Sequence, residues 1–103
     1  MSDVSQGVVA HGFARCDKPE RYIQQLVSHW SHKFAAHYDA DSRTGTIPFS
    51  DTETAVLAAE DCGIGITLTT GDDERSRHMR GVIERHIDRF AFREAPLTYD
   101  WND

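Results

Sequence analysis

Two short segments concentrate the histidines, cations and aromatic side chains of this chain. Residues 28–33 read SHWSHK, and residues 85–94 read RHIDRFAFRE. Each segment falls at the C-terminal end of a predicted helix, where the helix dipole is negative and favours nearby cations. Imidazoles at these ends could bind a metal ion, and the arginines and lysine could bind an anion.

A metal site is the first hypothesis. His29 and His32 are three residues apart, so one helix could turn both toward the same ion. Imidazole suits zinc, iron or nickel, and the third ligand could be His86 or Asp88. The pair diverges, however, because His29 lies at the edge of the helix's apolar stripe and His32 faces solvent. We therefore weigh a zinc or iron site at His29, His32 and His86 against purely structural histidines.

His86 lies in the centre of the apolar stripe of the second predicted helix. Burial of a charged imidazole is costly, which favours a neutral, hydrogen-bonded core histidine. Its partner would be Tyr22, Tyr99 or a backbone carbonyl. The functional alternative is a pocket between the two helices, near His29 and Trp30.

The cations suggest an anion site. Lys33, Arg89 and Arg93 could converge where the two helices end and bind a carboxylate or phosphate group. Together with His29 and His86 they form the predicted ligand-binding set. The alternative is helix capping with salt bridges to acidic neighbours, namely Glu84, Asp88 and Glu94.

No enzyme motif is present, whether a P-loop, GxGxxG, GxSxG or HExxH, and we predict no catalytic residues. A small enzyme using His29 or His86 as a general base ranks last among the hypotheses. Cys16 and Cys62 form no CxxC pair, and two thiols cannot build a disulfide scaffold, so both are predicted to be reduced.

Size and charge narrow the choice further. The chain has 103 residues, which suits one domain, and 17 acidic against 11 basic residues give a net charge of −6. This charge argues against binding to nucleic acid or to an anionic membrane. No hydrophobic run reaches transmembrane or signal length, so we expect a cytoplasmic protein. The arginines of the second helix are expected to form a solvated face; they are Arg75, Arg77, Arg80, Arg85, Arg89 and Arg93.

Hydrophobic periodicity predicts the elements that position these residues. Asp17 and Glu20 would form a capping box for a helix that runs to about His32. A second helix begins at residues 70–74 and carries its apolar stripe to Phe90. Alternation predicts the strands, at residues 8–15, 34–39, 46–49, 54–59, 64–69 and 97–101. Five aromatic residues fall at core spacing and are expected mostly to pack in the core, namely Trp30, Phe90, Phe92, Tyr99 and Trp101.

The element order is therefore β-α-β-β-β-β-α-β. It predicts an α+β fold, a two-layer sandwich with a mainly antiparallel sheet and two helices on one face. Residues 1–7 are predicted to be a flexible N-terminus and residues 8–103 a single domain. Trp101 could instead cover an exposed sheet or a dimer seam.

The stretch HIDRFAFRE at residues 86–94, with SHWSHK and the closing LTYDW, resembles the bacterial family called domain of unknown function 2218 (DUF2218). The resemblance covers the chain from about Ala10 to Trp101, and residues 39–54 depart most from it. It implies a small cytoplasmic protein without an assigned activity. Genes of this family often lie near siderophore or iron-handling genes, which implies an iron-related role.

Two functions follow as hypotheses. The first is an accessory protein that binds an anionic metal chelate, or a metal, in iron or siderophore handling. The second is a non-catalytic interaction module, either a homodimer or the partner of a larger protein. Its contact surface would be the open face of the sheet or the last strand.

Overall fold

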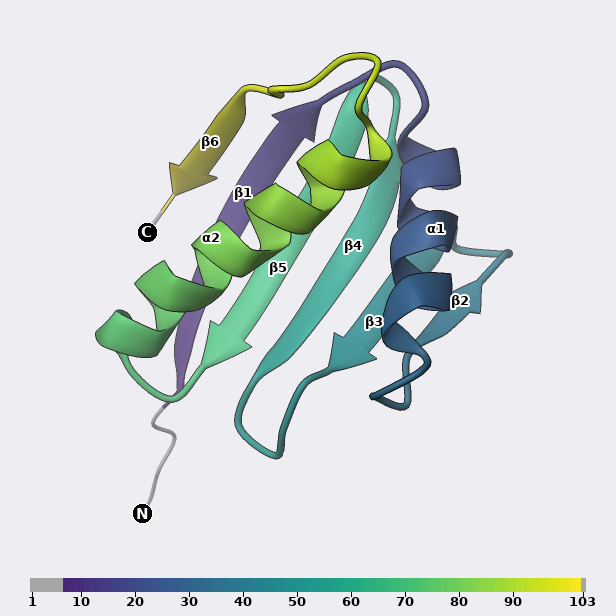
Figure 1. The fold of residues 1–103 in the computed structure, drawn as a ribbon. Helices are drawn as coiled ribbons and strands as arrows, with labels where there is room; N and C mark the ends of the chain where they lie inside the picture. The colour runs from purple at the N-terminus through teal and green to yellow at the C-terminus, as the bar shows by residue number, and fades with distance from the viewer. Residues whose placement is uncertain (1–6, 103) are drawn as a thin grey trace.

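A computed structural model describes residues 7–102 and has the predicted order of elements (Figure 1). Its elements are β1 (Val8–Arg15), α1 (Pro19–Trp30), β2 (His37–Asp39), β3 (Thr44–Pro48), β4 (Thr54–Glu60), β5 (Gly63–Thr70), α2 (Asp73–Phe90) and β6 (Tyr99–Asn102). The predicted flexible N-terminus lies outside the described residues except for Gly7, which is exposed.

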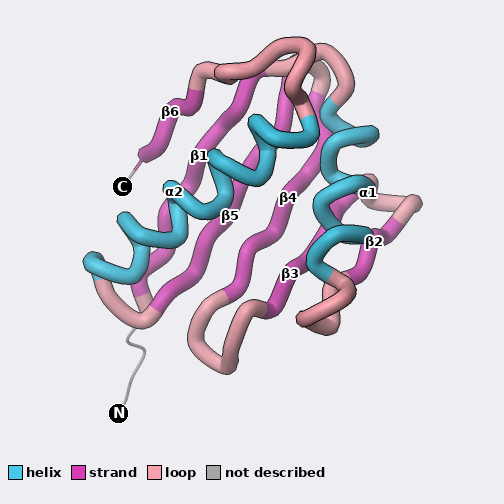
Figure 2. Tube along the Cα trace, in the orientation of Figure 1, coloured by secondary structure: helices cyan, strands magenta, loops and turns pink. Residues whose placement is uncertain are grey.

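All six strands join one antiparallel sheet in the order β2-β3-β4-β5-β1-β6. Both helices lie on the same face of this sheet, and the other face carries no helix (Figures 1 and 2). The predicted α+β sandwich is confirmed. Neither helix of residues 7–102 is long and apolar enough to cross a membrane.

The core lies between the sheet and the helices, because each element buries one side. The apolar stripe predicted for α1 is buried along its whole length. The buried positions of α2 follow the same helical spacing. The largest fully buried apolar side chains are Ile23, Leu26, Ile47, Leu57, Ile64, Leu68, Ile83 and Ile87. One hydrophobic cluster therefore joins both helices to the sheet.

The two helices begin differently. Asp72 caps α2, since its carboxylate accepts a hydrogen bond of 2.8 Å from the backbone N–H of Arg75. The predicted capping box of α1 is wrong: Lys18 occupies the cap position and makes no side-chain cap bond. The reason is a tertiary contact, because the backbone N–H of Asp17 donates to the carboxylate of Glu94, with distances of 3.0 and 3.2 Å to its oxygens.

Strand β6 fixes Trp101 on the helix-covered face of the sheet. The indole N–H donates to Glu84 of α2 at 2.6 Å, and the Arg80 guanidinium lies 5.3 Å from the ring centroid. The ring packs on Gly12 of β1, where an added Cβ would lie 2.7 Å from a ring atom. Trp101 therefore belongs to the packing between β6 and α2.

Candidate functional site

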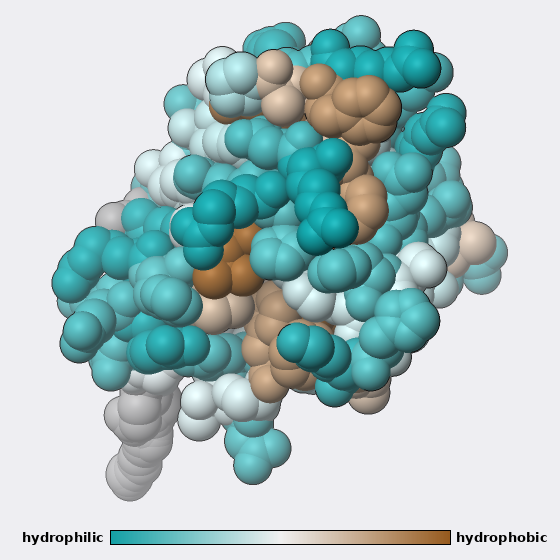
Figure 3. All heavy atoms as spheres, in the orientation of Figure 1, coloured by the Kyte–Doolittle hydropathy of each residue, from teal (hydrophilic) through white to brown (hydrophobic). Residues whose placement is uncertain are grey.

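Two pockets open beside the contact between α1 and α2, where hydrophobic residues reach the surface among hydrophilic ones (Figure 3). The histidine pocket has a volume of about 440 Å³ and is lined by His29, Trp30, His32, Lys33, Phe34, Phe49, Met79, Val82 and His86. The arginine pocket has a volume of about 580 Å³ and is lined by Asp17, Lys18, Arg21, Tyr22, Gln25, Phe90, Phe92, Arg93 and Glu94.

Packed rings build the wall of the histidine pocket. The centroid of the His86 ring lies 4.7 Å from that of Trp30 and 5.4 Å from that of His29. Phe49 lies edge-on to both Trp30 and Phe34, at 5.1 Å in each case. The pocket therefore offers flat aromatic surfaces, which suit a planar apolar group.

The sequence suggests two roles for His86, a hydrogen-bonded structural histidine and a pocket residue, and the structure combines them. The ring is half-buried, and its Nδ1 lies 2.7 Å from the carbonyl oxygen of Val82. A carbonyl only accepts hydrogen bonds, so Nδ1 carries the proton and Nε2 is an acceptor in the neutral ring. His86 thus has a backbone partner and also lines a pocket with His29 and Trp30.

The surroundings of His29 are electropositive. Burial lowers the pKa of His29 below its usual range, and the nearby His86, Arg89, His32 and Lys33 lower it further. Among residues 7–102, the lining of the histidine pocket contains no aspartate or glutamate. Imidazoles and one lysine therefore surround an apolar space, and no described carboxylate lines it to balance added positive charge.

The three histidines do not form a metal-binding group. Across residues 7–102, no cluster of three or more histidine, cysteine, aspartate or glutamate side chains is arranged to hold an ion. His29, His32 and His86 share the lining of one pocket, but His32 is exposed, and no further histidine, cysteine or carboxylate of the described residues completes a ligand set with His29 and His86. This arrangement does not support the predicted zinc or iron site.

The predicted cation trio is divided. Lys33 lines the histidine pocket and Arg93 the arginine pocket, whereas Arg89 lines neither and acts on His29 through its charge.

The predicted salt bridges of this trio are also absent among the described residues, where the ion pairs within 4.0 Å involve Arg43 and Arg75. The acidic neighbours bind uncharged donors instead. Glu84 accepts from Trp101, Asp88 from the Tyr99 hydroxyl at 2.7 Å, and Glu94 from the Tyr22 hydroxyl at 2.6 Å.

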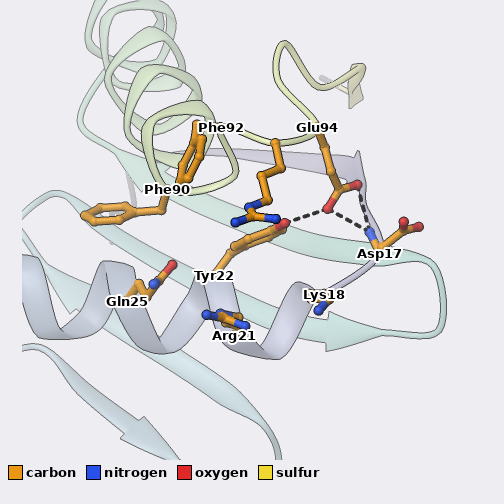
Figure 4. Close-up of a pocket in the computed structure, with 9 residues that line it drawn as sticks. Asp17, Lys18, Arg21, Tyr22, Gln25, Phe90, Phe92 and Glu94 are labelled. Carbon is orange, nitrogen blue, oxygen red and sulfur yellow. Dashed lines mark hydrogen bonds between the residues drawn. The ribbon is translucent and has the colours of Figure 1, made fainter.

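In the arginine pocket, Glu94 ties the end of α2 to the start of α1 (Figure 4). Its hydrogen bond to the hydroxyl, together with burial, raises the pKa of Tyr22 to about 12. Phe92 lies on the same rim and is 70% exposed. The prediction that Phe92 packs in the core is wrong, because the turn after α2 carries it outside the helical repeat.

Sequence reasoning missed the α1 side of the arginine pocket, namely Lys18, Arg21 and Gln25. A signal was present, since Arg21, Gln25, His29 and Lys33 recur at every fourth residue, so the first three lie along one side of α1 and Lys33 follows in the turn after it. This polar line borders both pockets in turn. Whether these residues border a pocket depends on the position of α2, and hydrophobic periodicity does not predict that position.

Comparisons with known proteins agree with the fold and add no activity. A family model described as "Uncharacterized protein conserved in bacteria (DUF2218)" matches residues 11–102. The NMR structure of PA4090 from Pseudomonas aeruginosa is similar, with a TM-score of 0.74 and 26% sequence identity. The similarity covers 91% of this chain and 94% of that one. Among curated proteins, none matches the chain.

Proposed function

Since the chain belongs to the DUF2218 family of bacterial proteins, whose description assigns no activity, we propose a function from its geometry: it binds a small aromatic anion in the histidine pocket. The observation that carries this proposal is the composition of the lining. Three histidines and a lysine surround packed aromatic rings, and no carboxylate lines the same space.

Charge supports an anion as the ligand. The whole chain has a net charge of −6, yet the groups that act on His29 are cations or imidazoles. A bound carboxylate or phenolate would relieve this repulsion and would pair with the ammonium group of Lys33. It would also favour the charged form of His29, so proton uptake would accompany binding.

Size and shape support a ligand with one or two rings. Pockets for small molecules span roughly 300–1,000 Å³, and this one is near the lower end of that range at about 440 Å³. Phe49 and His86 are half-buried and present ring surfaces on which an aromatic ligand can stack, and the buried ring of Trp30 packs against both. Nε2 of neutral His86 can accept a hydrogen bond from a phenolic hydroxyl.

An aromatic arm of a metal chelate belongs to this class of ligand. The iron-related, cytoplasmic role that the family resemblance implies stays a prediction, and we propose it in this form: the protein holds a phenolate- or catecholate-type ligand, with or without iron. The geometry favours a chelate over a bare ion, because the residues from 7 to 102 offer no three-ligand group.

Calorimetric titration tests the proposal. The ligands are salicylate and 2,3-dihydroxybenzoate, each with and without ferric iron, and neutral benzyl alcohol is the ligand control. We expect saturable binding of the anions, weaker binding of the alcohol, and higher affinity at pH 6 than at pH 8. Zinc and ferrous ions alone are titrated in parallel.

Two cations give a pair of variants. Lys33→Gln removes the ammonium group of the histidine pocket, and Arg77→Gln removes an exposed cation that lines neither pocket. Only the first should weaken binding, by about tenfold for one charged hydrogen bond. Equal affinity for anion and alcohol, or tight binding of a bare ion that depends on His29, would contradict the proposal.

The open sheet face favours an interaction module as the second candidate. No helix covers this face, and Val9 on it is 48% exposed (Figure 1). A homodimer through this face would be detected by light scattering and weakened by Val9→Lys. A monomer at every concentration would exclude self-association, while a partner of another kind would have to be sought by its own binding assay.

A further inference from the structure

The arginine pocket has no part in the function proposed above, and its lining points to a ligand of its own. We propose that it binds a small organic oxyanion, a carboxylate or phosphate ester, whose apolar body carries a hydroxyl group. The proposal rests on three features of the lining: exposed cations without ion pairs, a buried amide oxygen without a partner, and an exposed phenylalanine.

The cations come from both helices. Lys18 and Arg21 lie at the start of α1, and Arg93 follows the end of α2. All three are exposed, and none has an ion pair within 4.0 Å among residues 7–102. Two carboxylates also line the pocket, but that of Glu94 already accepts bonds from Tyr22 and from the backbone of Asp17.

This arrangement suits an oxyanion. Two guanidinium groups can each donate a pair of hydrogen bonds to a carboxylate or phosphate, and the ammonium group adds a point charge. The carboxylate of Glu94 is hydrogen-bonded to Tyr22 and to the backbone of Asp17 at the β1–α1 junction (Figure 4). The Arg93 guanidinium makes no ion pair within 4.0 Å among residues 7–102, so it can pair with a ligand.

The side chain of Gln25 indicates that the ligand carries a hydrogen-bond donor. Its side-chain oxygen is buried and has no hydrogen-bond partner within the described part of the chain. In Figure 4 its amide end points into the space between α1 and the end of α2. Buried polar atoms are rarely unpaired, since an unpaired one keeps its full desolvation cost. A hydroxyl group on the ligand would supply the missing donor.

Phenylalanine side chains provide the apolar contact. Phe90 is half-buried, and Phe92 is 70% exposed. The Arg93 guanidinium lies 5.9 Å from the centroid of the Phe92 ring. An apolar ligand body would shield both rings from water, while its oxyanion would contact the guanidinium groups.

Titration followed by ¹⁵N–¹H NMR tests the site residue by residue. The probes are phenyl phosphate, 3-hydroxybenzoate and benzoate. We expect saturable shifts of the backbone signals of Arg21, Gln25 and Glu94. Arg21→Gln should weaken binding by about tenfold. Arg77→Gln is the matched control, because Arg77 is equally exposed but lines neither pocket. Shifts that never saturate, or equal weakening in both variants, would overturn the proposal.

Gln25→Leu tests the hydroxyl group. In the native chain 3-hydroxybenzoate should bind more tightly than benzoate. In the variant it should bind only as tightly as benzoate, whose own affinity should not change. Equal affinities of the two probes for the native chain would overturn the assignment of a hydroxyl-bearing ligand.

A third variant separates the two pockets. Lys33→Gln changes the histidine pocket and should leave the shifts at Arg21 and Glu94 unchanged. Loss of these shifts in Lys33→Gln would show one shared site and would overturn an independent arginine pocket. If anions fail to bind only at the histidine pocket, the shifts at Arg21 and Glu94 still establish the arginine pocket.

Discussion

At the scale of single residues, His29 is the most informative side chain. It lines the histidine pocket with His86, and it contacts the ring of Phe90, whose centroid lies 5.6 Å away and which lines the arginine pocket. Its lowered pKa has two sources, burial and surrounding positive charge, and both act in the absence of an anion. The residue therefore links the proposed binding of an anion to pH.

The same lowered pKa predicts a loss of stability in acid. Below the ordinary histidine pKa of 6.5, the unfolded chain takes up a proton at His29 that the folded chain does not. Stability from this residue is complete above pH 6.5 and falls as the pH drops. His29→Gln should therefore lose less stability than the native chain between pH 7 and pH 5, as measured by urea unfolding.

The exposed His37 of β2 provides the control for this experiment. His37→Gln removes a histidine that is not among the groups acting on the pKa of His29. It should change the loss of stability in acid less than His29→Gln does. If His29→Gln and the native chain lose stability in parallel, the imidazole of His29 is not the group responsible.

At the scale of elements, we expect a loss of stability from an alanine substitution at the start of α2 but not at the start of α1. Asp72→Ala should destabilise the chain by about 1 kcal/mol, because it removes the cap bond to the Arg75 N–H. Asp17→Ala should change stability by less than about 0.5 kcal/mol, since only the backbone of Asp17 makes a described bond. Thermal unfolding compares the stability of the two variants. Equal losses would show that the side chain of Asp17 caps α1 as the sequence predicted.

The seating of β6 on β1 gives a second test at this scale. Gly12→Ala would place a Cβ 2.7 Å from the Trp101 ring and should cost about 1–3 kcal/mol of stability. Gly71→Ala is the control, because nothing lies within 4 Å of its added Cβ. Urea unfolding measures both. An unaltered Gly12→Ala variant would mean that Trp101 does not pack on β1.

The sequence predicted the elements well because their signals are local. Helical and alternating patterns placed both helices and all six strands in order, and the apolar stripe of α1 is buried as expected. The pockets were predicted only in part, because they depend on how the helices meet. The hydrogen bond between Tyr22 and Glu94 joins residues 72 positions apart, and Glu94 also accepts from the backbone N–H of Asp17. No local pattern indicates either contact.

At the scale of the whole molecule, ligand binding and folding are one equilibrium. Both pockets are built from α1 and α2 together, so an unfolded chain has neither. A ligand that binds only the folded state adds stability in proportion to the logarithm of its concentration. The proposed anions are therefore expected to act as stabilisers.

This linkage predicts a shift in thermal unfolding. At a ligand concentration of about 100 times Kd, the free energy of unfolding should rise by about 2.7 kcal/mol. The salicylate effect should be reduced in Lys33→Gln, and the phenyl phosphate effect should be reduced in Arg21→Gln, each relative to the native chain. Scanning calorimetry at a fixed pH measures the shift, and no shift at saturating ligand would refute the linkage.

The pairing of β6 with β1 also has a consequence for biosynthesis. Strand β1 emerges from the ribosome before its partners β5 and β6, which begin at Gly63 and Tyr99. During translation the nascent β1 therefore exposes two unpaired edges, one until β5 arrives and the other until β6 does. Exposed strand edges invite pairing between chains. Protection of this segment during synthesis is thus a requirement that the topology imposes on the cell.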